Sequence, residues 1–308
     1  MSFTTEVKNE ICSFSFDNLD KMTELCGFVR NNYSKNGDKI VLMTENPKVA
    51  RRVFTLFKDI YDINLKVEQR KGVNFSNKKF YFIEVSSKVD VIFDDLCLNS
   101  DSVKDYLIGE RELKVAYLRG SFLACGSIND PKTARYHLEY LTEKYKEALL
   151  ISNLLVFFDI NNKIINRDYG YMIYVKEAEK IADFLRLINA SRAVLYYEDI
   201  RIYRDHKNMT NRLNNCEQAN VEKVIKSSNS QIDDIKKIID IIGIDAVPLK
   251  LKEVMEYRLK YPDTSLSELS LIMSKETTNN ITKSGLNHRL RKIKELREKL
   301  EGFKKNTN

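Results

Sequence analysis

The 308-residue chain lacks the features that mark membrane and secreted proteins. It has no run of about 18 apolar residues, so we expect no membrane-spanning helix. Its first residues, MSFTTEVKNEI, carry charge early and have no apolar core of the kind found in a signal peptide. We therefore expect a cytoplasmic protein without membrane contact.

The chain also has few metal-binding and redox-active side chains. The cysteines are odd in number and none lie close together in sequence: Cys12, Cys26, Cys97, Cys125 and Cys216. This spacing favours small buried side chains over a disulfide framework or a zinc site. The three histidines are too scattered for a metal cluster. We expect no catalytic residue, no cofactor and no metal.

Positive charge is unevenly placed along the chain. The net charge is +7, and residues 249–308 contain 14 Lys/Arg against 8 Asp/Glu. The preceding 248 residues carry 37 and 36, which nearly cancel. A local basic excess is what a phosphate-binding surface needs, although a solvated basic helix has the same composition.

Two similar stretches divide the first 200 residues. Leu118-Arg-Gly-Ser-Phe-Leu-Ala-Cys-Gly126 has a weaker copy 93 residues earlier, Leu25-Cys-Gly-Phe-Val-Arg-Asn-Asn-Tyr33. After each copy the pattern predicts a strand, a helix, a hairpin and a helix. We expect a duplicated unit in residues 1–200, with repeats at about 1–100 and 108–190. Residues 201–248 are predicted to be a helical linker, and their Asn-rich part needs packing to stay helical.

Residues 249–308 are predicted to form a separate domain of three helices. The first covers 251–261, and Pro262-Asp263 ends it. Ser265-Leu-Ser-Glu268 is a capping box, with Leu266, Leu269 and either Ile272 or Met273 facing inward. A turn at 275–280 precedes a helix capped by Thr282 or Ser284. This helix runs to about Leu300, with an apolar stripe of Leu286, Leu290, Ile293, Leu296 and Leu300.

Two helices joined by a turn, the second of them basic, suit helix-turn-helix DNA binding, although a small structural bundle shares the pattern. The apolar stripe turns Ser284, His288 and Arg291 outward, with Lys283 and Asn287 beside them. Arg289 and Lys292 lie nearer the sides and suit phosphate contacts. Gly285 lets backbone approach a phosphate. We expect these eight residues to contact double-stranded DNA.

The stretch from Leu118 to Gly126 resembles the LAGLIDADG motif of homing endonucleases through Leu118, Gly120, Ala124 and Gly126. The resemblance implies that two motif helices pack at a pseudo-twofold axis and that the hairpins form saddle-shaped sheets. Family enzymes hold divalent metal with a carboxylate at the foot of each motif helix, where this chain has Asn32 and Cys125. An amide and a thiol are poor replacements, so we expect no nuclease activity.

The whole order of motifs is similar to the WhiA family of bacterial DNA-binding regulators. This similarity rests on the stretches 118–131 and 136–139, and on NRLNNCEQAN at 211–220 and ITKSGLNHRL at 281–290. Membership implies an α+β fold, with a duplicated αββαββα-type domain followed by an all-α helix-turn-helix domain. It also implies roles in cell division, chromosome segregation, transcription regulation and, in sporulating relatives, sporulation, in association with the nucleoid. Cys125, where a small residue such as Gly is expected, and the long 275–280 turn depart from the family.

Two other functions stay open at this point. The first is an active LAGLIDADG-type DNA endonuclease. The second is a scaffold whose duplicated domain binds a protein partner. The basic hairpin residues Arg70, Lys71, Lys78 and Lys79 would face DNA in the endonuclease arrangement, but Glu68 and Glu84 dilute this patch. Because the internal repeat supplies its own pseudo-dyad, we expect a monomer.

Overall fold

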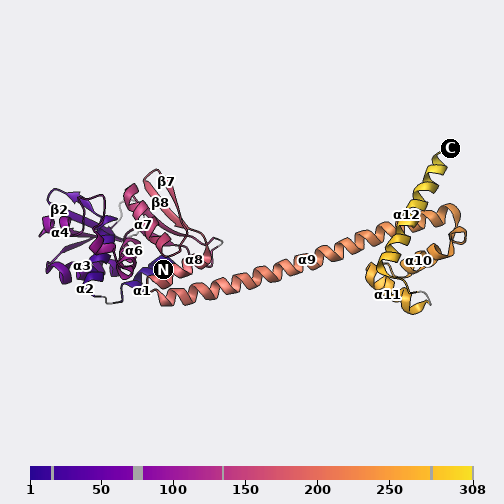
Figure 1. Ribbon diagram of the computed structural model, residues 1–308, viewed down its shortest axis with the longest axis horizontal. Coiled ribbons are helices and arrows are strands. Elements are labelled where there is room, and N and C mark those ends of the chain that lie inside the picture. The colour runs from indigo at the N-terminus through magenta and orange to yellow at the C-terminus, as the bar shows by residue number, and fades with distance from the viewer. Residues whose placement is uncertain (15–16, 72–78, 134, 278–279, 307–308) are drawn as a thin grey trace. The chain divides into compact units, whose positions relative to one another are not determined.

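The computed structural model describes residues 1–14, 17–71, 79–133, 135–277 and 280–306 (Figure 1). The chain divides into two compact units, Met1–Asp205 and His206–Asn308. Its α+β class agrees with the prediction. No helix in the described ranges is long and apolar enough to cross a membrane.

The first unit repeats the order αββαββα after an N-terminal helix, α1 (Phe3–Ile11). The first repeat contains α2 (Asn18–Arg30), β1 (Ser34–Asn36), β2 (Lys39–Thr44), α3 (Pro47–Tyr61), β3 (Lys66–Lys71), β4 (Lys79–Val85) and α4 (Val89–Asp95). After α5 (Asp105–Ile108), the second contains α6 (Arg111–Cys125), β5 (Gly126–Ile128), β6 (Leu138–Thr142), α7 (Tyr145–Phe157), β7 (Lys163–Arg167), β8 (Gly170–Val175) and α8 (Ala178–Leu187). The predicted duplication is confirmed.

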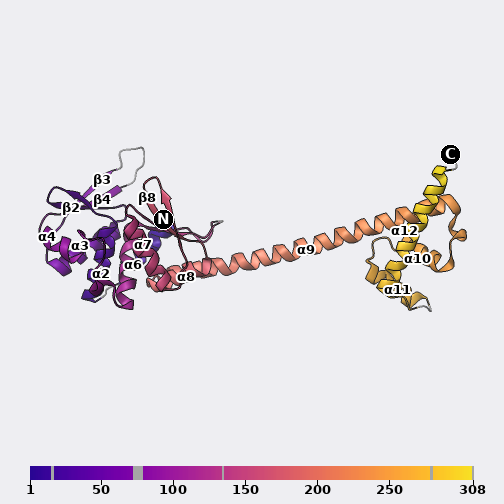
Figure 2. The ribbon, with the colours of Figure 1, turned by 45° about the horizontal axis from the view of Figure 1, so that its top comes forward.

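Each repeat forms one four-stranded antiparallel sheet. The strand orders are β1-β2-β4-β3 and β5-β6-β8-β7, which are equivalent between the repeats. The element-by-element prediction missed β1 and β5, because strands of three residues are too short to show alternation. In the view of Figure 2, α2, α3 and α6 lie below β2, β3 and β4, so the helices cover one face of that sheet.

The motif helices α2 and α6 pack backbone against backbone. A Cβ atom added at Gly120 would overlap the carbonyl oxygen of Glu24, and one added at Gly27 would overlap that of Tyr117. Glycine at both positions is what permits this close approach. The predicted role of the motif in helix packing is therefore seen in the close contact between α2 and α6. Around it lies one apolar core that includes Leu25, Phe28, Leu118 and Phe122.

A single 52-residue helix, α9 (Ser191–Ile242), contains residues 201–242 of the predicted linker at 201–248. Its Asn-rich part at 211–220 is helical although all its side chains are exposed, contrary to the expectation that packing would hold it. Ile235 and Ile238, near its end, are buried in the core of the second unit. That core therefore uses residues from before position 249.

The second unit adds a short 3₁₀ helix (Ile244–Ala246), α10 (Leu249–Lys260), α11 (Leu266–Glu276) and α12 (Lys283–Asn306). The capping box is confirmed, since Ser265 and Glu268 each accept a hydrogen bond from the other's backbone amide. Met273, rather than Ile272, is the buried residue of the pair. Leu286, Leu290 and Ile293 are also buried, as the apolar stripe predicted.

Two boundaries differ from the prediction. Helix α11 continues through Lys275 and Glu276, so the connection spans 277–282 and not 275–280. The Ser274 hydroxyl joins its ends by donating to the Ile281 carbonyl and accepting from the Ile281 amide. Helix α12 runs to Asn306 rather than Leu300. Of the two caps considered, Thr282 accepts the hydrogen bond from the Gly285 amide, at 3.2 Å.

Candidate nucleic-acid interface

The predicted contact residues lie on the N-terminal half of α12. Lys283, Ser284, His288, Arg291 and Lys292 are exposed, on the side opposite the buried Leu286 and Leu290. Gly285, Asn287 and Arg289 are half-buried at the edges of this surface. We call these eight residues the α12 basic face. Their placement follows from the helical period, because residues three and four apart share one side.

In the described part of the second unit, ion pairs leave the positive charge of the α12 basic face largely unneutralised. No described carboxylate forms an ion pair with Lys283, Arg291 or Lys292. Farther along the helix, Arg297 pairs with Asp234 at 2.9 Å and with Glu301 at 2.8 Å. The cations near the start of α12 are therefore available to an external anion, whereas Arg297 holds α12 against α9.

Arg289 is also incompletely satisfied. Its Nη1 atom is buried and has no hydrogen-bond partner among the described residues. Gly285, four positions earlier, has open space around its α-carbon except for the Thr282 hydroxyl. A backbone without side chains next to a guanidinium is a surface on which a phosphate can approach closely.

The exposed face of the first sheet carries charge that is largely paired within the sheet. Glu68 forms ion pairs with Lys66 and Arg70, each at 2.7 Å, and Lys39 forms one with Glu84 at 2.7 Å. The two hydrogen bonds to Glu68 lower the pKa of its carboxyl to about 2. Of the predicted hairpin contacts, Arg70 is thus committed to Glu68, Lys71 and Lys79 are exposed, and Lys78 lies outside the described residues.

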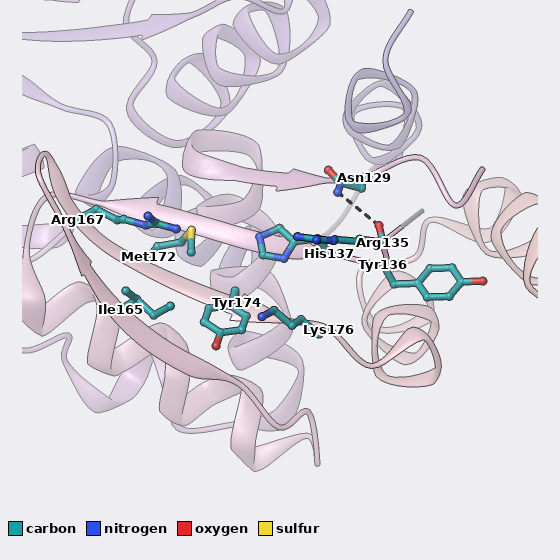
Figure 3. Close-up of a pocket in the computed structure, with 9 residues that line it drawn as sticks. All are labelled: Asn129, Arg135, Tyr136, His137, Ile165, Arg167, Met172, Tyr174 and Lys176. Atoms are coloured by element: carbon teal, nitrogen blue, oxygen red, sulfur yellow. Dashed lines mark hydrogen bonds between the residues drawn. The ribbon is translucent and has the colours of Figure 1, made fainter. Parts of the chain in front are cut away.

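The second sheet has a concave basic face that the sequence reasoning missed. It is a hollow of about 640 Å³, shown in Figure 3, and its cations are Arg135, Arg167 and Lys176. No described carboxylate forms an ion pair with any of the three. The ring of Tyr174 stacks on His137 at 5.8 Å, and Lys176 Nζ lies 4.7 Å from the Tyr174 ring centroid.

The sequence contains the residues of this second surface, but they are distributed over separate strands. Arg167 and Ile165 alternate along β7, and Met172 and Tyr174 along β8. Only pairing of the strands places Ile165 opposite Met172 and so gathers these side chains on one face. A one-dimensional scan for clustered basic residues finds the β3–β4 hairpin instead.

The feet of the motif helices carry no carboxylate at the motif positions. Asn32 Oδ1 accepts a hydrogen bond from the Met43 amide at 2.8 Å. The Cys125 thiol donates to the Ser121 carbonyl oxygen at 3.3 Å, and burial raises its pKa to about 12. The thiol therefore stays protonated at neutral pH. These donors do not fit a Mg²⁺ site, because Mg²⁺ prefers anionic oxygen ligands.

A lysine amine lies beside the foot of α6. Lys8 Nζ donates to the Leu123 carbonyl oxygen at 3.1 Å and lies 5.5 Å from the Phe122 ring centroid. Burial lowers its pKa to about 8, although the nearby Cys125 opposes this shift. The structure thus places a cation, and not a metal-binding acid, next to Cys125. Within the described ranges, no group of three or more His, Cys, Asp or Glu side chains is arranged to hold a metal ion.

Two buried acids that contact the motif helices serve as ion-pair or hydrogen-bond partners. Glu24 is fully buried and forms ion pairs with Arg119 at 2.7 Å and with Arg52 at 2.8 Å. Glu147 similarly accepts hydrogen bonds from the Arg30 Nε at 2.9 Å and from the Tyr117 hydroxyl at 2.7 Å. With these partners the two carboxylates stabilise the joint of α2, α3, α6 and α7, a role that the sequence did not show.

Fold and surface together define a class: a LAGLIDADG-like α+β unit joined to a helix-turn-helix unit with a basic face. Family models agree with this division. A WhiA N-terminal LAGLIDADG-like domain matches residues 21–99, a WhiA LAGLIDADG-like domain matches 114–207, and a WhiA C-terminal HTH domain matches 210–297. The chain belongs to the WhiA family.

Similar proteins cover almost the whole chain. A "Probable cell division protein WhiA" of Listeria welshimeri is 38% identical, over 97% of this chain and 95% of its own length. One of Bacillus mycoides is 39% identical, over 97% of both chains. The crystal structure of full-length DUF199/WhiA from Thermatoga maritima superposes with a TM-score of 0.58 at 26% identity, over 97% of this chain and 99% of that one.

Proposed function

We propose that this protein binds double-stranded DNA without cutting it and acts in cell division and chromosome segregation as a transcription regulator. The relatives' name, probable cell division protein, supports the cellular role. In sporulating relatives the regulated genes would include sporulation genes. The protein would act in the cytoplasm as a monomer associated with the nucleoid.

The observation that supports DNA binding most is the unpaired charge of the α12 basic face. Arg291 and Lys292 are exposed near the start of a helix that follows a capped helix and a turn. In helix-turn-helix proteins the second helix enters the major groove. Ser284 and His288 would then meet base edges, and Lys283, Arg289 and Lys292 would meet phosphates.

Removal of two of these charges tests the proposal. The double variant Arg291→Ala/Lys292→Ala should bind a random-sequence duplex more weakly and show a shallower dependence on salt. Each lost phosphate contact lowers the slope of log affinity against log salt by about 0.9. Fluorescence anisotropy at several salt concentrations measures both quantities.

The matched control is Lys207→Ala/Lys236→Ala, which removes the same charge from exposed positions of α9. It should keep nearly the wild-type slope. If both variants have the wild-type affinity and slope, α12 is not the DNA-contacting helix.

The second sheet supports an additional DNA contact in the first unit. Arg135, Arg167 and Lys176 have no carboxylate partner among the described residues, whereas Arg70 is paired with Glu68. Arg135→Ala/Arg167→Ala should therefore lower the salt slope more than Arg70→Ala/Lys71→Ala. The opposite order would move the secondary contact back to the predicted β3–β4 hairpin.

The paired face of the first sheet instead suits a protein partner. Met43 is 45% exposed there, and the ring of Phe82 lies under Arg70 at 4.8 Å. Apolar and aromatic side chains among neutralised charges are typical of protein interfaces. Loss of nuclease activity is supported by Asn32 and Cys125. Sequence-specific nicking with Mg²⁺ or Mn²⁺ that survives purification would favour the endonuclease alternative.

A further inference from the structure

The second unit contains a cavity of about 340 Å³, and Lys283 alone among its described lining residues also belongs to the α12 basic face. It lies where the later part of α9 meets α10, the start of α11 and the first residue of α12. Its charged and hydroxyl-bearing lining includes Lys223, Ser227, Arg258, Ser265, Ser267 and Lys283. No carboxylate is among the described lining residues, so the cavity is positively charged.

Arg258 is the buried member of this lining, with 1% of its surface exposed. Its Nη1 donates to the Thr264 carbonyl oxygen at 2.8 Å, and to the Ser228 hydroxyl and the Tyr261 carbonyl oxygen at 3.4 Å. All three acceptors are uncharged. Its Nε atom is buried with no hydrogen-bond partner in the described chain.

A buried guanidinium without an anionic partner is costly. Desolvation lowers the pKa of Arg258, and no nearby carboxylate opposes that shift. The buried arginines of the first unit differ, since Arg119 and Arg52 both reach Glu24. An oxyanion in the cavity would supply the missing charge.

The start of α11 presents further donors to the same cavity. Ser265 and Glu268 use each other's amides in the capping box. The amides of Leu266 and Ser267, also in the first turn, have no acceptor among the described residues. Free first-turn amides and the helix dipole together favour an anion.

We propose that this cavity is a phosphate-binding site formed by Arg258, Lys223, Lys283 and the first turn of α11. The phosphate could belong to a DNA backbone or to a free phosphorylated small molecule, because both present the same oxygens. The DNA source rests on the proposed function, whereas the free source does not.

The first measurement uses inorganic phosphate and the full chain. Phosphate added at constant ionic strength should shift the amide resonances of Leu266 and Ser267 saturably. Lys223→Ala/Ser267→Ala, whose side chains are both exposed, should raise the dissociation constant about tenfold, as seen at Leu266. Lys226→Ala/Ser230→Ala removes the same groups from exposed α9 positions outside the lining and should leave the dissociation constant unchanged.

The second measurement compares duplex binding by the same variants. If the phosphate is a DNA phosphate, Lys223→Ala/Ser267→Ala lowers the salt slope by about 0.9, and inorganic phosphate competes with the duplex. If it belongs to a small molecule, that slope stays at the wild-type value while the phosphate titration still changes.

The proposal is wrong if Lys223→Ala/Ser267→Ala matches the wild-type protein in both measurements. Arg258 would then have only a structural role, in which its hydrogen bonds connect α9 to the 261–264 turn. That result would not affect the proposed function, because Arg291→Ala/Lys292→Ala would still weaken DNA binding.

Discussion

At the scale of single residues, Lys8 makes the stability of the fold rise as the pH becomes alkaline. Burial lowers its pKa from 10.5 to about 8. The folded state therefore binds fewer protons than the unfolded state between about pH 8 and 10.5. Below pH 8 the cost of burying the charged amine is fully present. Its contribution to stability rises as pH increases through this window.

Lys8→Met should raise the free energy of unfolding at pH 7 by about 1–2 kcal/mol, because it removes a buried charge and keeps an apolar chain. The gain should shrink near pH 10, where the wild-type amine is neutral. Urea unfolding at both pH values measures it, with Lys48→Met at an exposed position as control. An equal gain at both pH values would contradict the assigned cause.

At the scale of secondary-structure elements, the joint between α2 and α6 determines how the first unit is built. Its two glycines bring backbones together, and Glu24 then joins α2 to Arg119 of α6. The same contact brings the two repeats into one core. The helix motif thus supports architecture, while its former metal positions hold Asn32 and Cys125.

Gly120→Ala should lower the free energy of unfolding by about 2–3 kcal/mol, because its Cβ would overlap the Glu24 carbonyl and push the helices apart. Gly302→Ala is the matched control, since nothing lies within 4 Å of its added Cβ. There the better helix propensity of alanine should leave stability equal or slightly higher. Equal losses at both sites would mean that the close approach is not what matters at Gly120.

At the scale of the whole molecule, the chain has two separate apolar cores, one in each unit. Each core can melt without exposing the other, because no buried apolar residue in the described ranges belongs to both clusters. The helix α9 belongs to both units, with Tyr197 in the first core and Ile235 in the second.

Calorimetry should therefore resolve two unfolding transitions. Gly120→Ala should shift only one of them. Ser265→Ala, which removes the N-cap of α11 at a cost of about 1 kcal/mol, should shift only the other. A single transition that both variants lower together would show that the two cores unfold as one cooperative unit.

Much of the fold was predictable because its signals are local. The capping box at Ser265 and the apolar stripe from Leu286 to Ile293 each depend on residues a few positions apart. The two motif glycines were found because the short stretches around them resemble each other. β1 and β5 were missed because three residues cannot show a period. The turn at 275–280 was placed too early because Lys275 and Glu276 are polar yet helical. The Asn-rich part of α9 is helical without the expected packing.

The sequence by itself determined the duplication, the helix-turn-helix order and the outward face of α12, since helical period and local capping require no distant partner. Only the tertiary structure decided which charges are free. Arg70 is neutralised by Glu68 two residues away, whereas Arg135 and Arg167 come together across β6, β8 and β7. Arg258 becomes a buried cation without a carboxylate only once α9, α10 and α11 meet. Electrostatic availability depends on distance in space, which the order of residues does not specify.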